Sequence, residues 1–125
     1  MASYIRNLLN RFIFRKPRDR RLYFRKPLSL KVTNQQSGMF SYYTSKDISA
    51  GGMFLKAEEP PPVGTKLHLE FTLPPGSSPI RTSAVVVRVV VHSQGRDVTT
   101  GMGIRFTDLK KKDREHIEKF VVEPY

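Results

Sequence analysis

The chain has 125 residues, a formal net charge of +11 and no cysteine. This length suits one domain with one hydrophobic core, and the lack of cysteine excludes disulfides and thiolate metal sites. Residues 1–27 hold nine Arg or Lys and one acid. Such a basic N-terminal part serves as a solubilising tail or binds an anionic partner: a phosphate ligand, nucleic acid or an acidic membrane surface.

Residues 3–15 place apolar side chains at the spacing of one helical face, with the arginines largely off that face. The apolar positions are Ile5, Leu8, Leu9, Phe12 and Ile13. The pattern predicts a basic amphipathic helix, within an N-terminal arm at residues 1–19, that packs on its own domain, on a second copy or on an anionic membrane. Because arginines interrupt the apolar run, it is not a secretory signal. No segment reaches the roughly 20 apolar residues of a membrane span, and both features favour the cytoplasm.

Pro17 ends the helical pattern, because the residue before a proline avoids the α conformation. The segment from Lys16 to Lys26 has three apolar residues, Leu22, Tyr23 and Phe24, among cations and a proline. So little apolar surface does not offset the entropy of ordering, about 1–2 kcal/mol per residue. We therefore expect this segment to be mobile until an anionic ligand gives its arginines fixed partners.

From Leu28 the hydrophobic period changes to two, which is typical of half-buried strands. Strands are predicted at residues 28–33, 40–46, 52–56, 66–73, 80–92 and 99–106. Turn residues separate them, first at 34–38 and then in a turn that starts at Asp47. In the fourth strand the inward positions are Leu67, Leu69, Phe71 and Leu73. The run at 84–91 is β-branched on both faces, which predicts a strand covered on both sides.

These strands predict a mainly β fold, a six-stranded antiparallel β-barrel that is closed or nearly closed. A C-terminal helix at residues 110–122 should follow, with Asp108 as its N-cap. Its narrow apolar stripe consists of Leu109, Ile117, Phe120 and Val121. Such a helix suits an open end of the barrel. Packing in the core or at its rim is expected for Met53, Phe54, Met102 and Phe106.

Two short motifs flank the first predicted hairpin. Arg21-x-x-x-Arg25 ends just before the first strand, and Asp47-x-Ser49-x-x-Gly52 joins the second strand to the third. By itself the second motif describes a tight turn, because Asp and Ser bond their own backbone and Gly allows positive φ. By itself the first motif carries little information in a chain with twelve arginines.

The two motifs occur in this order along the chain and are followed by Gly-Met-Gly-Ile-Arg-Phe at residues 101–106 and by a terminal helix. With this arrangement the chain resembles the PilZ domain family. The resemblance covers residues 20–122, departs from neither motif and implies little about residues 1–19. It implies a PilZ domain at residues 20–125 that binds the bacterial second messenger cyclic di-GMP. It also implies no enzyme activity, no cofactor and no metal.

The resemblance assigns the ligand contacts to Arg20, Arg21, Arg25, Asp47, Ser49, Gly51 and Gly52. Their chemistry suits this ligand, because an arginine fork fits phosphate oxygens and the guanine O6/N7 edge. A carboxylate can accept bonds from guanine N1–H and N2–H₂, a hydroxyl adds a short polar contact, and glycine lets the backbone approach closely. In the family, an arginine just before the pair, here Arg20, goes with two intercalated ligands per domain.

Catalysis has little support. His68, His92 and His116 are scattered over two strands and a helix, and no His/Asp/Glu spacing indicates a metal site. Two other functions stay open: non-specific nucleic-acid binding, for which Tyr23 and Phe24 supply aromatic rings among basic residues, and a degenerate adaptor that binds only protein. The intact motif argues against the second, and nucleic acid is not the partner that the resemblance implies. As a receptor, the chain would change conformation on ligand binding and pass its signal to a downstream protein.

Overall fold

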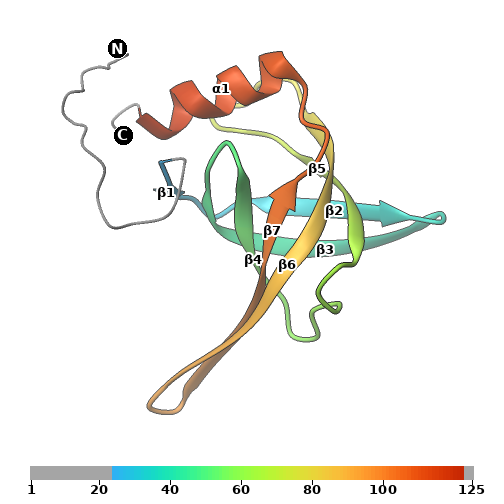
Figure 1. The fold of residues 1–125 in the computed structure, drawn as a ribbon. Helices are drawn as coiled ribbons and strands as arrows, with labels where there is room; N and C mark the ends of the chain where they lie inside the picture. The colour runs from blue at the N-terminus through green and yellow to red at the C-terminus, as the bar shows by residue number, and fades with distance from the viewer. Residues whose placement is uncertain (1–23, 123–125) are drawn as a thin grey trace.

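Alternating apolar and polar residues build most of the computed structural model, which describes residues 24–122 (Figure 1). Its elements are β1 (Lys26–Pro27), β2 (Lys31–Gln36), β3 (Met39–Ile48), β4 (Gly52–Lys56), β5 (Lys66–Phe71), β6 (Ile80–Gln94), β7 (Asp97–Phe106) and α1 (Lys111–Val122). The predicted helix at residues 3–15 and the boundary at residue 19 lie outside the described residues and stay predictions. No helix among residues 24–122 is long and apolar enough to cross a membrane.

Strands β2 to β7 form a closed antiparallel barrel of six strands, as the strand and turn pattern predicted (Figure 1). Hydrogen bonding runs β2–β3–β4–β7–β6–β5, and β5 returns to β2 through the pairs Thr33–Glu70 and Asn34–Leu69. The two-residue strand β1 was not predicted. It pairs with the last two residues of β3 and so attaches the start of the described chain to the end of that strand.

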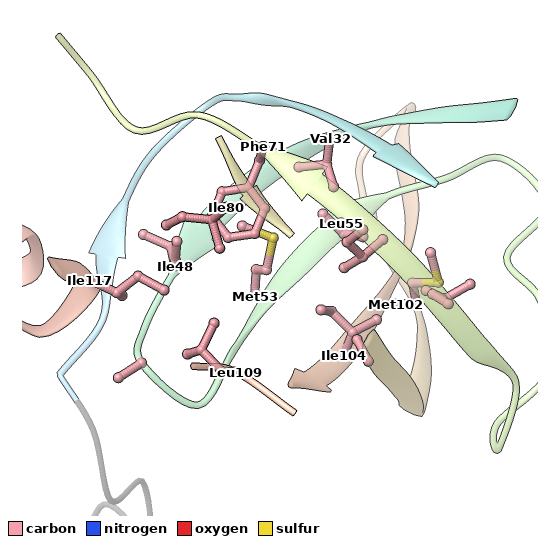
Figure 2. Close-up of a cluster of buried hydrophobic side chains, with 14 of the residues drawn as sticks. Val32, Ile48, Met53, Leu55, Phe71, Ile80, Met102, Ile104, Leu109 and Ile117 are labelled. Atoms are coloured by element: carbon pink, nitrogen blue, oxygen red, sulfur yellow. The ribbon is translucent and has the colours of Figure 1, made fainter. Parts of the chain in front are cut away.

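Side chains from all six barrel strands and from α1 fill the interior (Figure 2). β5 shows the predicted alternation, because Leu67, Leu69 and Phe71 are buried while the residues between them are exposed. Met53 and Met102 are buried in the same core. Burying a side chain of this size stabilises a fold by about 1.5–3 kcal/mol, so the alternation decides which face of each strand turns inward.

The helix α1 lies across one end of the barrel (Figure 1), as its apolar stripe predicted. Ile117 from the helix and Leu109 from the connection before it are buried in the core. The predicted N-cap is wrong. The Asp108 carboxylate accepts bonds from Ser83 N at 2.6 Å and Thr82 Oγ1 at 3.0 Å, both in β6, while the helix begins only at Lys111. Asp108 thus ties the β7–α1 connection to the barrel wall.

The β2–β3 hairpin turns on two residues, Ser37 and Gly38, whose φ angles are 53° and 78°. Two central residues with positive φ are typical of a type I′ turn, whose twist matches that of the flanking strands. The predicted turn at 34–38 is therefore too long, because β2 continues to Gln36, which pairs with Met39. The last residues of β2 are polar and exposed, so they show no alternation with apolar residues that would identify them as part of a strand.

Strands β6 and β7 continue past the barrel as a two-stranded extension, residues 87–100, which we call the β6–β7 arm (Figure 1). Their neighbours in the barrel do not extend along the arm, because β5 pairs with β6 only as far as Val85 and β4 pairs with β7 only from Gly101 onward. The prediction that the run at 84–91 is covered on both sides is wrong for its second half. Val91 is 66% exposed and Val98, on β7, is 63% exposed. β-branched residues favour a strand whether or not a neighbour covers it, so composition did not separate the two cases.

Candidate ligand-binding site

A β-bulge in β3 turns Asp47 to the outside of the barrel. Ser45 and Asp47 pair with successive residues of β4, so Lys46 is an extra residue on β3. Ser45 and Ile48 are both buried, and Asp47 stands on the outer face opposite Phe54. Bulges commonly re-aim a side chain beside a functional site. Asp47 is therefore a strand residue, and the turn that was predicted to start there starts at Ser49 instead.

Ser49 closes the turn between β3 and β4. Its hydroxyl accepts bonds from the backbone N–H groups of Gly51 at 3.2 Å and Gly52 at 3.3 Å, and its own N–H donates to Gly52 O at 2.8 Å. The residue is 3% exposed, so its side chain faces the turn and not the solvent. Ser49 thus shapes the loop that carries both glycines, and its direct contact with a ligand stays a prediction.

Gly52 is required by the neighbouring strand. A Cβ at this position would lie 1.9 Å from the carbonyl oxygen of Ile104 on β7, because β4 and β7 pair here with Gly52 opposite Arg105. Gly51 fixes the same loop to β7, since its carbonyl accepts a bond from Phe106 N at 3.0 Å. The sequence suggested that Gly52 lets the backbone approach a ligand. In the structure, Gly52 allows the close approach of β4 to β7.

Arg25 and Asp47 bring the two sequence motifs together. Arg25 Nη1 donates to Asp47 Oδ1 at 2.7 Å, and the same oxygen accepts the N–H of Phe54 at 3.2 Å. The two side chains are 26% and 28% exposed, so the pair is partly shielded but accessible. Within residues 24–122, Asp47 Oδ2 accepts no hydrogen bond and Arg25 Nη2 donates none. The pair therefore keeps acceptor and donor capacity on its open side.

Lys26, the residue after Arg25, is buried against the end of α1. Its Nζ donates to the backbone oxygen of Phe120 at 3.1 Å and lies 4.2 Å from the centroid of that ring. A cation is favourable here, because the last carbonyls of a helix carry partial negative charge. Lys26 also pairs with Ile48 in the sheet. The segment that carries Arg25 is therefore attached to both β3 and α1.

Two arginines outside the motifs share the outer face with Asp47. The register of the sheet places Asp47, Phe54, Gly103 and Arg88 in one row across β3, β4, β7 and β6. The Arg88 side chain lies over Gly103, where an added Cβ would be 2.8 Å from Arg88 Nε. Arg105 is exposed and follows two positions after Gly103, hence on the same face. Neither arginine was predicted, because the strand pattern does not contain the register that places them on the same outer face as Asp47.

The remaining predicted residues do not all fall within the described part of the chain. Arg20 and Arg21 lie outside residues 24–122, so their contacts stay predictions. Among the described residues, Arg25, Asp47, Ser49, Gly51 and Gly52 lie together at one end of β3 and β4 and in the loop that joins them. Within the same range, no three His, Asp or Glu side chains gather where they could hold a metal ion.

A groove of about 1030 Å³ lies on the part of the barrel formed by β2, β3, β5 and β6. None of the predicted site residues lines it. Its arginine and its carboxylates are engaged within the protein, since Arg81 pairs with Glu70 at 2.8 Å and Asp108 accepts two bonds from β6. We therefore place the candidate site at Asp47, where both motifs meet.

A family model described as PilZ domain matches residues 19–123. The chain has no match among the curated proteins with which it was compared. Among solved structures it is similar to the Bacillus subtilis inhibitor of motility, MotI/DgrA, with 25% identity and a TM-score of 0.71 over 86% of this chain and 54% of that one.

Two further structures are similar and are described as complexes with cyclic di-GMP. The PilZ domain of YcgR from Escherichia coli is 18% identical, with a TM-score of 0.66 over 82% of this chain and 89% of that one. MrkH from K. pneumonia is 23% identical, with a TM-score of 0.71 over 83% of this chain and 52% of that one. The chain thus spans about half the length of MotI/DgrA and MrkH. At this level of identity, both likenesses establish the shared barrel fold.

Proposed function

This chain belongs to the PilZ domain family, and from that premise we propose that it is a receptor for cyclic di-GMP. YcgR and MrkH are both described in complex with this ligand. One observation carries the proposal. Arg25 and Asp47, separated by 22 residues in the sequence and belonging to different motifs, are joined at 2.7 Å. The fold therefore assembles one arginine and the one carboxylate that the motif assigns to the ligand.

Asp47 is the residue that would read guanine. Its Oδ1 is held by Arg25 and by the N–H of Phe54, whereas Oδ2 accepts no bond within residues 24–122. A guanine presents N1–H and N2–H₂ as adjacent donors, which one carboxylate can accept together. Adenine lacks the N1–H donor and the O6 acceptor, so the same carboxylate would face a mismatched edge. Selectivity for guanine over adenine follows.

Arg25 would bind the ligand without leaving Asp47. A guanidinium has five N–H donors, and one of them is used by Asp47 in this structure. The others suit a phosphate or the O6/N7 edge of guanine. Arg20 and Arg21 would supply the remaining cations of the motif, and Arg88 and Arg105 add positive charge on the same outer face. The two phosphates of cyclic di-GMP match this concentration of positive charge.

Binding would order the basic segment that leads into Arg25. Within residues 24–122, Arg25 contacts β3 and Lys26 contacts both β3 and α1, and we expect a ligand on Arg25 to extend order toward residue 16. We further propose that this change is passed to a downstream protein in the cytoplasm, that the chain is an adaptor and not an enzyme, and that residues 1–19 form an arm outside the domain at 20–125. Amide hydrogen exchange over residues 16–27 tests the ordering, since equal protection with and without ligand contradicts it.

Calorimetric titration of the chain with cyclic di-GMP, cyclic di-AMP and GMP tests the function. We expect cyclic di-GMP to bind far more tightly than the other two, because only it presents two guanines joined by two phosphates. Equal affinity for cyclic di-AMP would overturn the proposal. Binding that shows no nucleotide preference and disappears at high salt would instead indicate non-specific attraction of polyanions, nucleic acid included.

A further inference from the structure

The barrel wall has a groove where β4 stops and its two neighbours continue. β4 ends at Lys56, which pairs with Thr44 of β3 and Gly101 of β7. Past these pairs, residues 42–44 of β3 face residues 98–100 of β7 across a groove of about 650 Å³ that residues 56–59 also line. The groove is separate from the candidate ligand site, because none of the predicted ligand contacts lines it.

The groove widens away from the end of β4. Neighbouring strands lie about 4.8 Å apart, so β3 and β7 are separated by about 10 Å where β4 still lies between them. Beyond that point β3 and the β6–β7 arm run apart (Figure 1). At the end of β4 this spacing leaves room for one strand only. A helix, which is about 10–12 Å across with its side chains, would therefore lie over the wider, open part of the groove.

The lining of the groove is mixed, with tyrosines, Ala57 and Val98 among threonines and charged residues, and it is acidic at one edge. Val98 is largely exposed, and Tyr43 packs half-buried against the core. Glu58 and Glu59 are exposed, and neither forms an ion pair within the part of the chain that the structure describes. Lys56 is the one cation among the lining residues. In a chain with a net charge of +11, this edge would attract a basic segment.

We propose that residues 3–15 of the same chain dock in this groove as a helix. Their apolar positions follow the i, i+3, i+4, i+7 spacing by which amphipathic helices bind grooves. Their cations, Arg6, Arg11 and Arg15, complement Glu58 and Glu59. The match covers both parts of the groove, because apolar anchors meet Val98 and Tyr43 while arginines meet the acidic edge.

The connection is long enough for docking within one molecule. Residues 16–23 span at most about 26–29 Å when extended. Lys26 pairs with Ile48 near the end of β3, and Thr44, at the edge of the groove, lies four residues back along that strand, or roughly 13 Å away. The linker therefore reaches the groove with length to spare.

Disulfide trapping tests the proposal without interference from native thiols, because the chain has no cysteine. Ile13→Cys lies at the edge of the apolar face and leaves four apolar anchors in place. It is combined with Val98→Cys in the groove, or with Thr100→Cys should the first variant fold poorly. The control pairs Ile13→Cys with Val122→Cys, a valine that is 60% exposed at the end of α1. Because Lys26 contacts Phe120, this control site is also close to the linker.

We expect the 13–98 disulfide to form at least about tenfold faster than the 13–122 disulfide, since docking raises the local concentration at the groove. Glu58→Lys with Glu59→Lys should slow the reaction, and Arg11→Glu with Arg15→Glu in that background should restore it. Equal rates at both sites would overturn the proposal. So would a product with the mass of two chains, which would place the helix on a second copy, or a rate that charge reversal does not change.

Discussion

Ser45 and Asp47 are two positions apart in β3, yet Ser45 is fully buried and Asp47 stands on the outer face. In a regular strand these two residues would share a face, and the bulge at Lys46 separates them. Ser45 uses its inward position to accept the N–H of Leu30 at 2.9 Å and to donate to the carbonyl of Leu28. Ser45 thus holds the chain before β2, and the bulge that follows it presents Asp47 beside Arg25.

Asp47→Asn should weaken cyclic di-GMP binding by about 1.5–3 kcal/mol, the scale of a hydrogen bond to a charged group. Removing a carboxylate from a basic surface would by itself favour any anion, so weaker binding identifies loss of the acceptor for guanine. Glu70→Gln is the matched control, because Glu70 forms a similar ion pair with Arg81 away from the site. Calorimetry measures both variants, and an unchanged or lower Kd for Asp47→Asn would restrict Asp47 to a structural role.

Arg21→Ala and Arg25→Ala should each cost about 1.5–3 kcal/mol of binding, whereas Arg11→Ala and Arg15→Ala should cost little beyond screened attraction. The difference arises because a positioned guanidinium makes directed bonds, while a distant one contributes only to the general field. Titrations at low and high salt separate the two effects. If all four variants weaken binding alike and the loss vanishes at high salt, charge alone accounts for the interaction.

Two ligands are expected per domain. A third cation before the paired arginines, Arg20, can neutralise additional phosphates and stack on an exposed guanine. Titration to saturation should end at two equivalents in the wild type and at one in Arg20→Leu. A clean endpoint of one equivalent for the wild type would refute this stoichiometry while leaving the receptor proposal intact.

Gly52→Ala should destabilise the fold by about 1–3 kcal/mol, the cost of overpacking. The new Cβ would meet the backbone of Ile104, which cannot rotate away. Gly103→Ala is the control on the paired strand, because the added Cβ there meets the Arg88 side chain, which can move. Denaturant unfolding compares the two, and a loss of stability at Gly103 as large as that at Gly52 would contradict the steric explanation.

Asp108 should make stability depend on pH in acid. The N–H of Ser83, followed by the hydroxyl of Thr82, donates to the ionised carboxylate and lowers the pKa of Asp108. A carboxyl with a lowered pKa in the folded state stabilises the fold above its unfolded pKa, and this contribution is lost as the pH falls through the folded value. Below about pH 4, the Tm of the wild type should therefore fall more steeply than that of Asp108→Asn.

Near neutral pH the Tm of Asp108→Asn should lie below that of the wild type, because the ionised carboxylate accepts both bonds in the wild type. Glu118→Gln, an exposed carboxylate change on α1, serves as the control. Parallel acid limbs for the wild type and Asp108→Asn would show that the contacts with β6 do not govern this titration.

The barrel could be predicted because its information is local. Period-two alternation marked the first and fourth predicted strands, and Leu67, Leu69 and Phe71 turned inward as the pattern required. The turn residues separated the strands, although Ser37 and Gly38 alone make the first turn. The family resemblance alone assigned Asp47 and Arg25 to one ligand, since neither residue is informative by itself, and their ion pair was not predicted.

What the sequence did not provide depends on register and on neighbours distant in the chain. The bulge at Lys46 and the row that places Arg88 on the same outer face as Asp47 arise from how strands align, and no single strand encodes that alignment. Exposure of Val91 depends on β5, whose pairing with β6 reaches no further than Val85. Asp108 resembled a cap by position, but the backbone of Ser83 offered its carboxylate a partner across the sheet.

The junction of β2 with β5 gives the barrel a seam. Two residue pairs close it, whereas β6 and β7 share ten. The buried Asn34 reinforces the seam, because its side-chain oxygen accepts the N–H of His68 at 2.9 Å. Local opening is easiest where few backbone bonds must break. We therefore expect the barrel to open first between β2 and β5, and the hydrogen bond from His68 to Asn34 to oppose this opening. β3, which carries Asp47, would stay paired with β4 while the junction of β2 and β5 opens.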